Sequence, residues 1–181
     1  MYKLITILIL LALSGCNATK NDEDEYLTIP QPLPGHDWKS HSKEINNMRQ
    51  TNWVSNKENG HMKLLIHFGQ GGASASGTAL TDEYQAKKAC NVFNSRTLFE
   101  GEDNGFDTSL STSSCKLNNR EFVILVKHIS GYDSFYSVFR RWEGTVTEDE
   151  LNNWVSYFKK IKLCKPGWVA HPCPKGFKEK T

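Results

Sequence analysis

The sequence predicts an α+β fold, in which a mainly antiparallel sheet of about five strands carries two helices in the order β-β-α-β-β-β-α. Three features carry this prediction. Asn59-Gly60 stands between two apolar runs, which is a strong hairpin signal. Residues 121–129 are apolar on both faces, as in a strand at the middle of a covered sheet. Residues 147–161 repeat their apolar side chains at helical spacing.

The hairpin consists of predicted strands over residues 50–55 and 62–68. Alternate side chains of a strand point to opposite faces. Four residues of the second strand therefore share one face, namely Met62, Leu64, Ile66 and Phe68. His67 lies on the other face, where we expect it to be outward or half-covered.

The first helix is predicted over residues 81–95. Thr81 can cap its amino terminus, and Asp82 and Glu83 stand in the first turn, where the helix dipole favours anions. Its apolar stripe would consist of Ala86, Ala89, Cys90 and Phe93.

Three more strands and a second helix complete the predicted domain. The strands cover residues 107–117, 121–129 and 134–143, separated by turn residues around Asn104, Asn118 and Gly131. Thr147 and Glu150 then fit a capping box. The helix that they begin should pack one stripe on the sheet, formed by Leu151, Trp154, Val155, Phe158 and Ile161.

The amino-terminal residues carry the pattern of an export signal. Lys3 supplies a positive start, residues 4–13 are apolar apart from Thr6, and Leu13-Ser14-Gly15-Cys16 ends the run with small residues and a cysteine. Such a short run does not comfortably span about 30 Å of hydrocarbon as a permanent helix. The ending resembles the lipobox of bacterial lipoproteins, and the resemblance covers this leader alone.

The lipoprotein resemblance implies a lipid anchor and a place in the cell envelope. In that family the signal peptide, here residues 1–15, is removed, and the thiol matching Cys16 receives a diacylglycerol. Two or three acyl chains anchor a protein stably to a membrane. Asn17, rather than an aspartate, follows the cysteine, which favours the outer membrane in a Gram-negative source. The alternative is an ordinary signal peptide with an incidental thiol.

Residues 16–45 are predicted to form a lipid-anchored tether, and residues 46–181 a single domain. The tether is acidic over residues 22–25 and then rich in proline. Such a composition buries too little apolar surface to fold, and its prolines favour an extended chain. The remaining length suffices to bury a core.

The charge balance argues against a nucleic-acid partner. Cleavage after residue 15 removes only Lys3 of the 22 lysines and arginines, which leaves 21 basic residues against 20 acidic ones. A nucleic-acid-binding protein would show a basic excess on a face or stripe.

The cysteines predict disulfides. Acylation of Cys16 would leave four, and an even number in an oxidising compartment is typical of disulfide pairs. Of three possible pairings we favour Cys90 with Cys115, which would tie a helix to a strand, and Cys164 with Cys173, which would close a short loop. A zinc site is the competing interpretation, but no two cysteines form a Cys-x-x-Cys hook and no helical histidine pair exists. We predict no metal and no other cofactor.

A glycine-rich loop over residues 69–77 offers an enzymatic alternative. It lacks the Gly-Lys-Ser/Thr ending of a P-loop, and it does not match the Gly-x-Ser-x-Gly nucleophile elbow. Ser74 or Ser76 could serve a periplasmic hydrolase only if folding brought His67 or His128 within hydrogen-bond reach. We expect a surface loop instead, and a small-ligand carrier is the third alternative.

The strand over residues 134–143 is the candidate partner-binding surface. It holds the densest run of aromatic and arginine residues, which are enriched in binding hot spots. The candidate contacts are Tyr136, Arg140, Arg141 and Trp142. The alternative is a core strand whose arginines lie at its end. The sequence thus predicts a non-catalytic envelope lipoprotein that binds a protein partner, of the immunity or envelope-assembly type.

Overall fold

The computed structural model describes residues 25–175, so the predicted leader, Cys16 and most of the acidic segment lie outside the described residues. Within this range the chain forms nine strands and two helices. In chain order they are β1 (Tyr26–Thr28), β2 (Lys39–Ile45), β3 (Met48–Val54), β4 (His61–Phe68), α1 (Ala75–Ala89), β5 (Val92–Asp103), β6 (Phe106–Leu117), β7 (Arg120–Ser130), β8 (Ser134–Glu143), α2 (Glu148–Phe158) and β9 (Lys162–Cys164).

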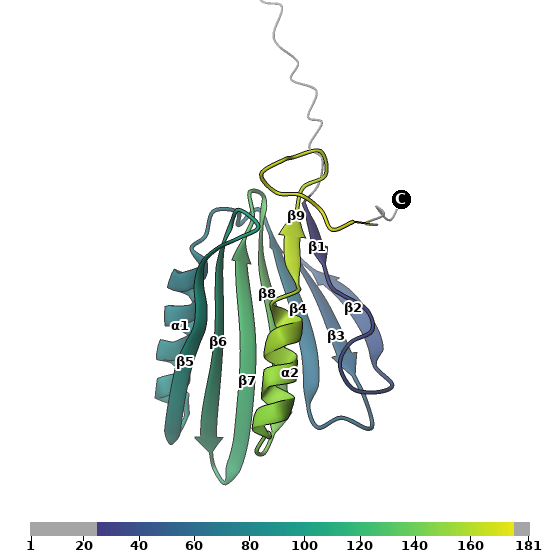
Figure 1. The fold of residues 1–181 in the computed structure, drawn as a ribbon. Coiled ribbons are helices and arrows are strands. Elements are labelled where there is room, and N and C mark those ends of the chain that lie inside the picture. Colours follow the sequence, from purple (N-terminus) through teal and green to yellow (C-terminus); the bar gives the residue numbers. More distant parts are fainter. Residues whose placement is uncertain (1–24, 176–181) are drawn as a thin grey trace, which may run out of the picture.

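Seven strands form one antiparallel sheet in the order β2-β3-β4-β8-β7-β6-β5, and β1 pairs with β9 in a separate small sheet. α1 connects the meander β2–β4 to the meander β5–β8, and β8 returns to pair with β4 (Figure 1). This return joins the two meanders into a single sheet.

The predicted α+β fold with about five strands in the order β-β-α-β-β-β-α was wrong. The domain is mostly β, with the order β-β-β-β-α-β-β-β-β-α-β. The strands β1, β2, β5 and β9 were missed. β2 and β5 are the two edges of the large sheet and are largely exposed, so they lack the apolar alternation that marks a half-buried strand. β1 and β9 are only three residues long.

Helix α1 begins earlier than predicted and ends before the predicted stripe is complete. Ser74 is its N-cap, and the Ser74 Oγ accepts a hydrogen bond from the Gly77 N–H at 3.1 Å. Thr81, the predicted cap, lies inside the helix and donates to the Gly77 carbonyl oxygen. Phe93 belongs to β5 rather than to the helix. The second half of the glycine-rich segment is therefore the first turn of α1.

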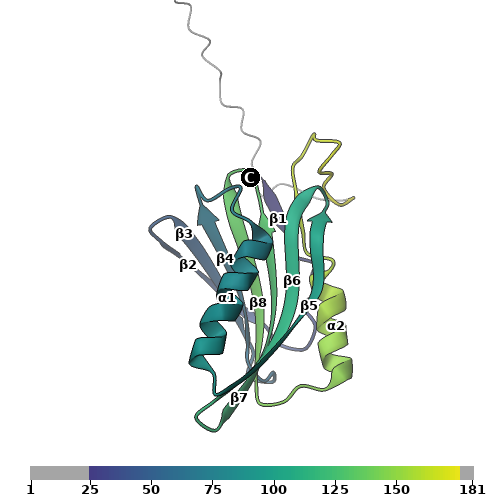
Figure 2. The same ribbon diagram turned by 90° about the vertical axis from the view of Figure 1, so that its left-hand side faces the viewer.

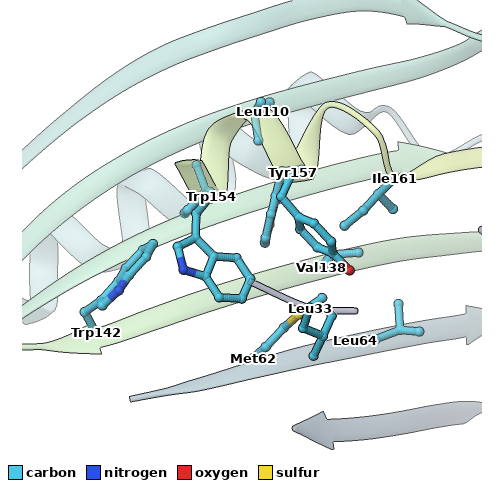
Figure 3. Packing of buried hydrophobic residues seen from close by; sticks show 11 residues of the cluster. Leu33, Met62, Leu64, Leu110, Val138, Trp142, Trp154, Tyr157 and Ile161 are labelled. Atoms are coloured by element: carbon cyan, nitrogen blue, oxygen red, sulfur yellow. The ribbon is translucent and has the colours of Figure 1, made fainter. Parts of the chain in front are cut away.

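The two helices lie on opposite faces of the sheet (Figures 1 and 2). α2 follows the predicted capping pattern, with the Thr147 Oγ1 accepting from the Glu150 N–H. Its residues Trp154 and Phe158 pack with Leu125 and Val138 of the sheet. Figure 3 shows Trp154 between Trp142 and Tyr157 at the centre of this cluster. The face under α2 is therefore the main core.

The proline-rich segment belongs to the fold, so the prediction of a tether over residues 16–45 was wrong for residues 25–45, and residues 16–24 lie outside the described part of the chain. Leu33 is buried in the main core, and Trp38 packs edge-on against Trp154 at 5.9 Å between ring centroids. The Tyr157 hydroxyl donates to the Pro30 carbonyl oxygen at 2.7 Å. Composition alone missed these contacts because the partners are distant in the chain, and two of them, Trp154 and Tyr157, lie more than a hundred residues away.

Both predicted disulfides are present. Cys90 at the end of α1 is bonded to Cys115 of β6, and Cys164 of β9 is bonded to Cys173. Neither helix in the described part of the chain is long and apolar enough to span a membrane.

Candidate functional site

One half of the sheet has a face that no helix covers in the described structure. α1 packs on β5, β6 and β7, and the same face of β2, β3 and β4 lies beside it without a helix (Figure 2). We call this surface, together with the adjoining part of β8, the open face. Its side chains are Lys39, His41, Lys43, Ile45, Met48, Gln50, Asn52, Val54, His61, Lys63, Leu65, His67, Phe139, Arg141 and Glu143.

Strand register brings these side chains into rows across the sheet. His41 pairs with Asn52, which pairs with Lys63, and Lys63 in turn pairs with Phe139. Because paired residues of antiparallel strands point to the same face, each row is a line of neighbouring side chains. Asn52 also accepts a hydrogen bond from the Gln50 side-chain amide at 2.9 Å.

The open face is strongly basic. It carries three lysines, three histidines and Arg141, whereas β2, β3 and β4, all within the described residues, place no aspartate or glutamate on it. β8 adds one acidic residue at the border, Glu143, which lies 3.7 Å from Arg141. Glu44 of β2 points to the opposite face, where it pairs with Arg49. Neither Lys43 nor Lys63 has an acidic partner within ion-pair distance in the described structure. These charges are therefore available to a ligand.

The pKa of His61 responds to this positive field. Burial lowers the pKa of the imidazole below its usual value, and the charges of Lys63, Arg141 and Arg140 lower this pKa further, against a smaller opposite effect of Glu143. A cation added to this face is thus disfavoured, and an anion is favoured.

Arg141 lies at the border of the open face. Its guanidinium stands 3.9 Å from the centre of the Phe122 ring and 3.7 Å from the Glu143 carboxylate. Its side chain is 35 % exposed, and its buried Nε has no hydrogen-bond partner in the described residues. Of the predicted partner residues, this one alone stands on the open face.

The other three predicted partner residues are buried. Tyr136, Arg140 and Trp142 expose 4 %, 0 % and 1 % of their surface, so they cannot form an exposed patch. They lie on the face under α2, because alternation in β8 sends them opposite to Arg141. The prediction that they contact a partner was wrong, and the core-strand alternative describes them better.

Arg140 is enclosed by aromatic rings. Its guanidinium lies 5.1, 4.7 and 4.9 Å from the ring centres of Trp38, Trp142 and Trp154. Glu58 stands 3.8 Å away. Burial lowers the pKa of Arg140 to about 10, which leaves it charged at neutral pH. The guanidinium thus occupies the space between the three tryptophan rings, and Arg140 has a structural role there.

Ser74 and Ser76 do not face a histidine in the described structure. The Ser74 Oγ caps α1, and the two hydroxyl oxygens lie 3.1 Å apart. The preceding loop is held to the β7–β8 turn: the Gly72 N–H donates to the Gly131 carbonyl at 2.9 Å, and a Cβ on Gly71 would meet the Tyr132 carbonyl oxygen. Helix capping and close packing account for this segment.

A serine, a histidine and an aspartate do meet beneath α1. His128 Nδ1 lies 2.9 Å from the Ser137 hydroxyl, and its Nε2 lies 3.4 Å from the Asp82 carboxylate. However, Ser137 is 4 % and His128 1 % exposed, and His128 stacks on Phe135. A nucleophile must reach its substrate, so this constellation is a packed polar contact and not an active site.

The described residues offer weaker candidates for a small-ligand pocket or a metal site than for a binding surface on the open face. A cavity of about 310 Å³ opens beside the Gly144–Val146 segment, lined by mixed polar and apolar residues such as Lys116, Glu121 and Phe122. It is at the small end of ligand pockets. No group of three or more potential ligands is arranged to hold a metal ion among residues 25–175.

No protein family model matches the chain, and no curated protein or solved structure is significantly similar to it. Function must therefore be inferred from the geometry of the domain itself. The sequence contained a signal for the open face that the sequence-based prediction missed. Basic residues stand at every second position over residues 39–43, which is the spacing of one strand face: they are Lys39, His41 and Lys43.

Proposed function

We propose that this chain is a lipid-anchored protein of the bacterial cell envelope that binds an acidic segment of a protein partner on its open face, without catalysis. The observation that carries the proposal is the accumulation of basic side chains from β2 and β4, among them Lys43 and Lys63 without an acidic partner, on a face where β2, β3 and β4 place no acidic residue. Folding places like charges together at an energetic cost, and a ligand of opposite charge would offset that cost.

The chemistry of the open face favours a protein segment over a small anion. The basic groups are spread along three strands, and between them lie Leu65 and Phe139, which are half-buried and apolar. An extended acidic segment with some apolar side chains would match both features. β2 is also an edge strand, so a partner strand could pair with its free backbone groups.

The proposed place in the envelope rests on the lipobox resemblance and on the disulfides. Two disulfides suit an oxidising compartment. An immunity lipoprotein that captures an incoming toxin and an envelope-assembly protein would both need such a binding face. The hydrolase alternative is disfavoured by the occupied Ser74 hydroxyl and the buried Ser137.

Two neighbouring residues of β2 allow a matched test. His41 lies on the open face and Ser42 on the opposite face, and both are exposed. A photo-crosslinking amino acid is placed at each position in turn, in cells that make the lipidated protein. We expect an acidic segment of one protein to be captured from position 41 and not from position 42. Equal capture from both positions, or capture of a segment without acidic residues, would contradict the proposal.

Charge reversal tests the same surface independently. The variant Lys43→Glu/Lys63→Glu should lose the position-41 crosslink, whereas Lys160→Glu, at an exposed position just after α2, should keep it. Raised salt should weaken capture by the unaltered protein, since exposed charges are screened over about 10 Å at 0.1 M ionic strength. A double variant that captures the partner as well as the unaltered protein would refute the electrostatic basis.

The anchor has its own test. Cys16→Ser should abolish labelling of the chain by a fatty-acid analogue and release the protein from membranes. Labelling that persists in this variant would refute acylation at Cys16.

A further inference from the structure

The loop closed by the Cys164–Cys173 disulfide presents an apolar surface. We call residues 165–172 the C-terminal loop. Val169 is 97 % and Trp168 45 % exposed, and the neighbouring Tyr132 in the β7–β8 turn is 53 % exposed. The exposed residues of the loop, 167–170 and 172, include no charged side chain. Such a concentration of exposed apolar groups is typical of an interaction site.

The C-terminal loop is held in one shape by His171. This side chain is 6 % exposed and packs at a tilt against Phe106, with ring centres 4.4 Å apart. His171 Nδ1 lies 3.0 Å from the Asn104 carbonyl oxygen, which can only accept, so Nδ1 carries a proton. In the neutral ring Nε2 then accepts from the Tyr132 hydroxyl at 2.7 Å. The exposed Trp168 and Val169 are therefore displayed on a fixed support.

The chemistry of this end of the domain suits a membrane interface. Tryptophan and tyrosine concentrate at the headgroup level, where one end of the side chain is apolar and the other is hydrated. Lys165 Nζ lies 4.7 Å above the Trp168 ring and 5.7 Å from the Tyr132 ring. A lysine beside interfacial aromatics can reach lipid phosphates while its stem stays in apolar surroundings.

The same end of the domain is where the chain arrives from the proposed anchor. The Glu25 carboxylate accepts a hydrogen bond from the Tyr132 backbone N–H, and the Tyr136 hydroxyl lies 3.4 Å from it. Figure 1 shows the C-terminal loop beside the start of β1. Only residues 17–24 separate Cys16 from Glu25, a distance of at most about 30 Å even when fully extended. An acylated Cys16 would hold Tyr132 within that reach of the bilayer.

We propose that the C-terminal loop inserts Trp168 and Val169 into the interfacial layer of the bilayer that anchors the chain. This inference rests on the proposed lipid anchor. The long strands of the sheet then point away from the membrane, because the loop lies at one end of them (Figure 1). The open face, which runs along these strands, would then stay accessible to a partner. The loop thus acts as a second, weak contact that fixes the orientation set loosely by the acyl chains.

Tryptophan fluorescence of the lipidated protein in vesicles tests the inference. Phosphatidylcholine brominated on the acyl chains near the headgroup quenches tryptophans that enter the interface. The emission of Trp168 is obtained as the difference between the unaltered protein and Trp168→Phe. We expect brominated lipid to remove most of this difference while the remaining tryptophans, in Trp168→Phe, keep their emission. An unquenched Trp168 in membrane-bound protein would overturn the inference.

The substitution Trp168→Phe could alter the signal by changing the conformation of the loop. A second pair of variants, which keep Trp168, tests for this effect. Val169→Asp places a charge at the most exposed apolar position and should reduce the quenching of Trp168, whereas Leu80→Asp on α1, also at an exposed position, should leave it unchanged. Equal quenching in all three proteins would contradict insertion. Capture of a protein by the loop, without quenching, would assign the loop to a protein partner and also overturn the inference.

The two proposals fail in distinguishable ways. Fatty-acid labelling is measured on the same sample as the quenching. Unlabelled protein that does not bind vesicles would refute the anchor and the loop insertion with it. Labelled, vesicle-bound protein without quenching would refute the loop insertion alone.

Discussion

The two faces of the large sheet are built on different principles. Under α2 the face is apolar and closed, and that helix buries Trp154, Tyr157 and Phe158. Under α1 the face is rich in serine, and that helix buries only Ala75. Beyond α1 the same face is open and basic. The main apolar core therefore lies on one face, and we expect that face to supply most of the stability, which leaves the other free to carry charged groups.

Even the charges on the closed face are compensated. Lys127 is 2 % exposed, and its ammonium group donates to the Ile161 carbonyl at 2.7 Å, to the Phe158 carbonyl at 3.3 Å and to Asp103 at 2.8 Å. Burial lowers the pKa of Lys127, and burial alone would raise that of Asp103. Hydrogen bonds from Lys127 and Lys162 outweigh burial and lower the Asp103 pKa. The lysine also satisfies carbonyls at the end of α2.

α1 is attached by other means than apolar packing. The Cys90–Cys115 disulfide ties its carboxyl end to β6, and the Ala75 N–H at its first turn donates to Asp107 at 2.9 Å. Two of its large apolar residues, Leu80 and Tyr84, are exposed. We therefore expect perturbations of the two helices to differ in size and in kind.

The largest expected effect comes from truncating α2. Phe158→Ala removes a fully buried ring and should lower the free energy of unfolding by about 3–5 kcal/mol. Leu80→Ala in α1 should change it by no more than about 0.5 kcal/mol. Urea denaturation with the disulfides intact measures both. Similar losses from the two variants would mean that the two helices contribute equally to stability.

Removing the disulfide of α1 should have the next largest effect. Cys90→Ser/Cys115→Ser should lower the free energy of unfolding by about 2–4 kcal/mol, since the open chain regains conformational entropy. Hydrogen exchange should accelerate in α1 and remain slow in α2. Uniform acceleration in both helices would show that α1 is not attached separately.

A smaller effect is expected from neutralising the open face. Lys63→Gln removes a positive charge close to His61 and should raise the free energy of unfolding by up to about 0.5 kcal/mol at low salt. The gain should shrink as salt is added, because the repulsion is screened. Denaturation at two ionic strengths checks this, with Lys160→Gln as the control. A destabilised Lys63→Gln would show that the lysine is compensated after all.

The smallest effect depends on pH. Because the pKa of His61 is lowered on folding, the unfolded chain binds its proton first as pH falls below the ordinary value of about 6.5. The stability should therefore decrease from about pH 6.5 downward, through the folded-state pKa. His61→Gln should flatten this part of the stability curve, as measured by urea denaturation at a series of pH values. An unchanged slope in His61→Gln would assign the pH dependence to other groups.

Local signals in the sequence predicted several elements correctly. The hairpin of β3 and β4 follows from Asn59-Gly60, α2 follows from its capping box and apolar stripe, and β8 matches the predicted residues 134–143. Both disulfide pairs were also predicted. Each of these signals lies within a short stretch of chain, or in a count of cysteines, and does not depend on what packs against it.

Only the tertiary structure decided which charged residues are exposed. Arg140 and Arg141 are neighbouring arginines of β8, and the sequence does not distinguish them. In the structure Arg140 is enclosed by three tryptophans, whereas Arg141 borders the open face. The near-neutral net charge gave no sign that Lys43 and Lys63 share one basic surface. Sequence determined periodicity, caps and cysteine number because these act over a few residues. Strand register between distant segments determined the faces, and register depends on the packing of the whole sheet.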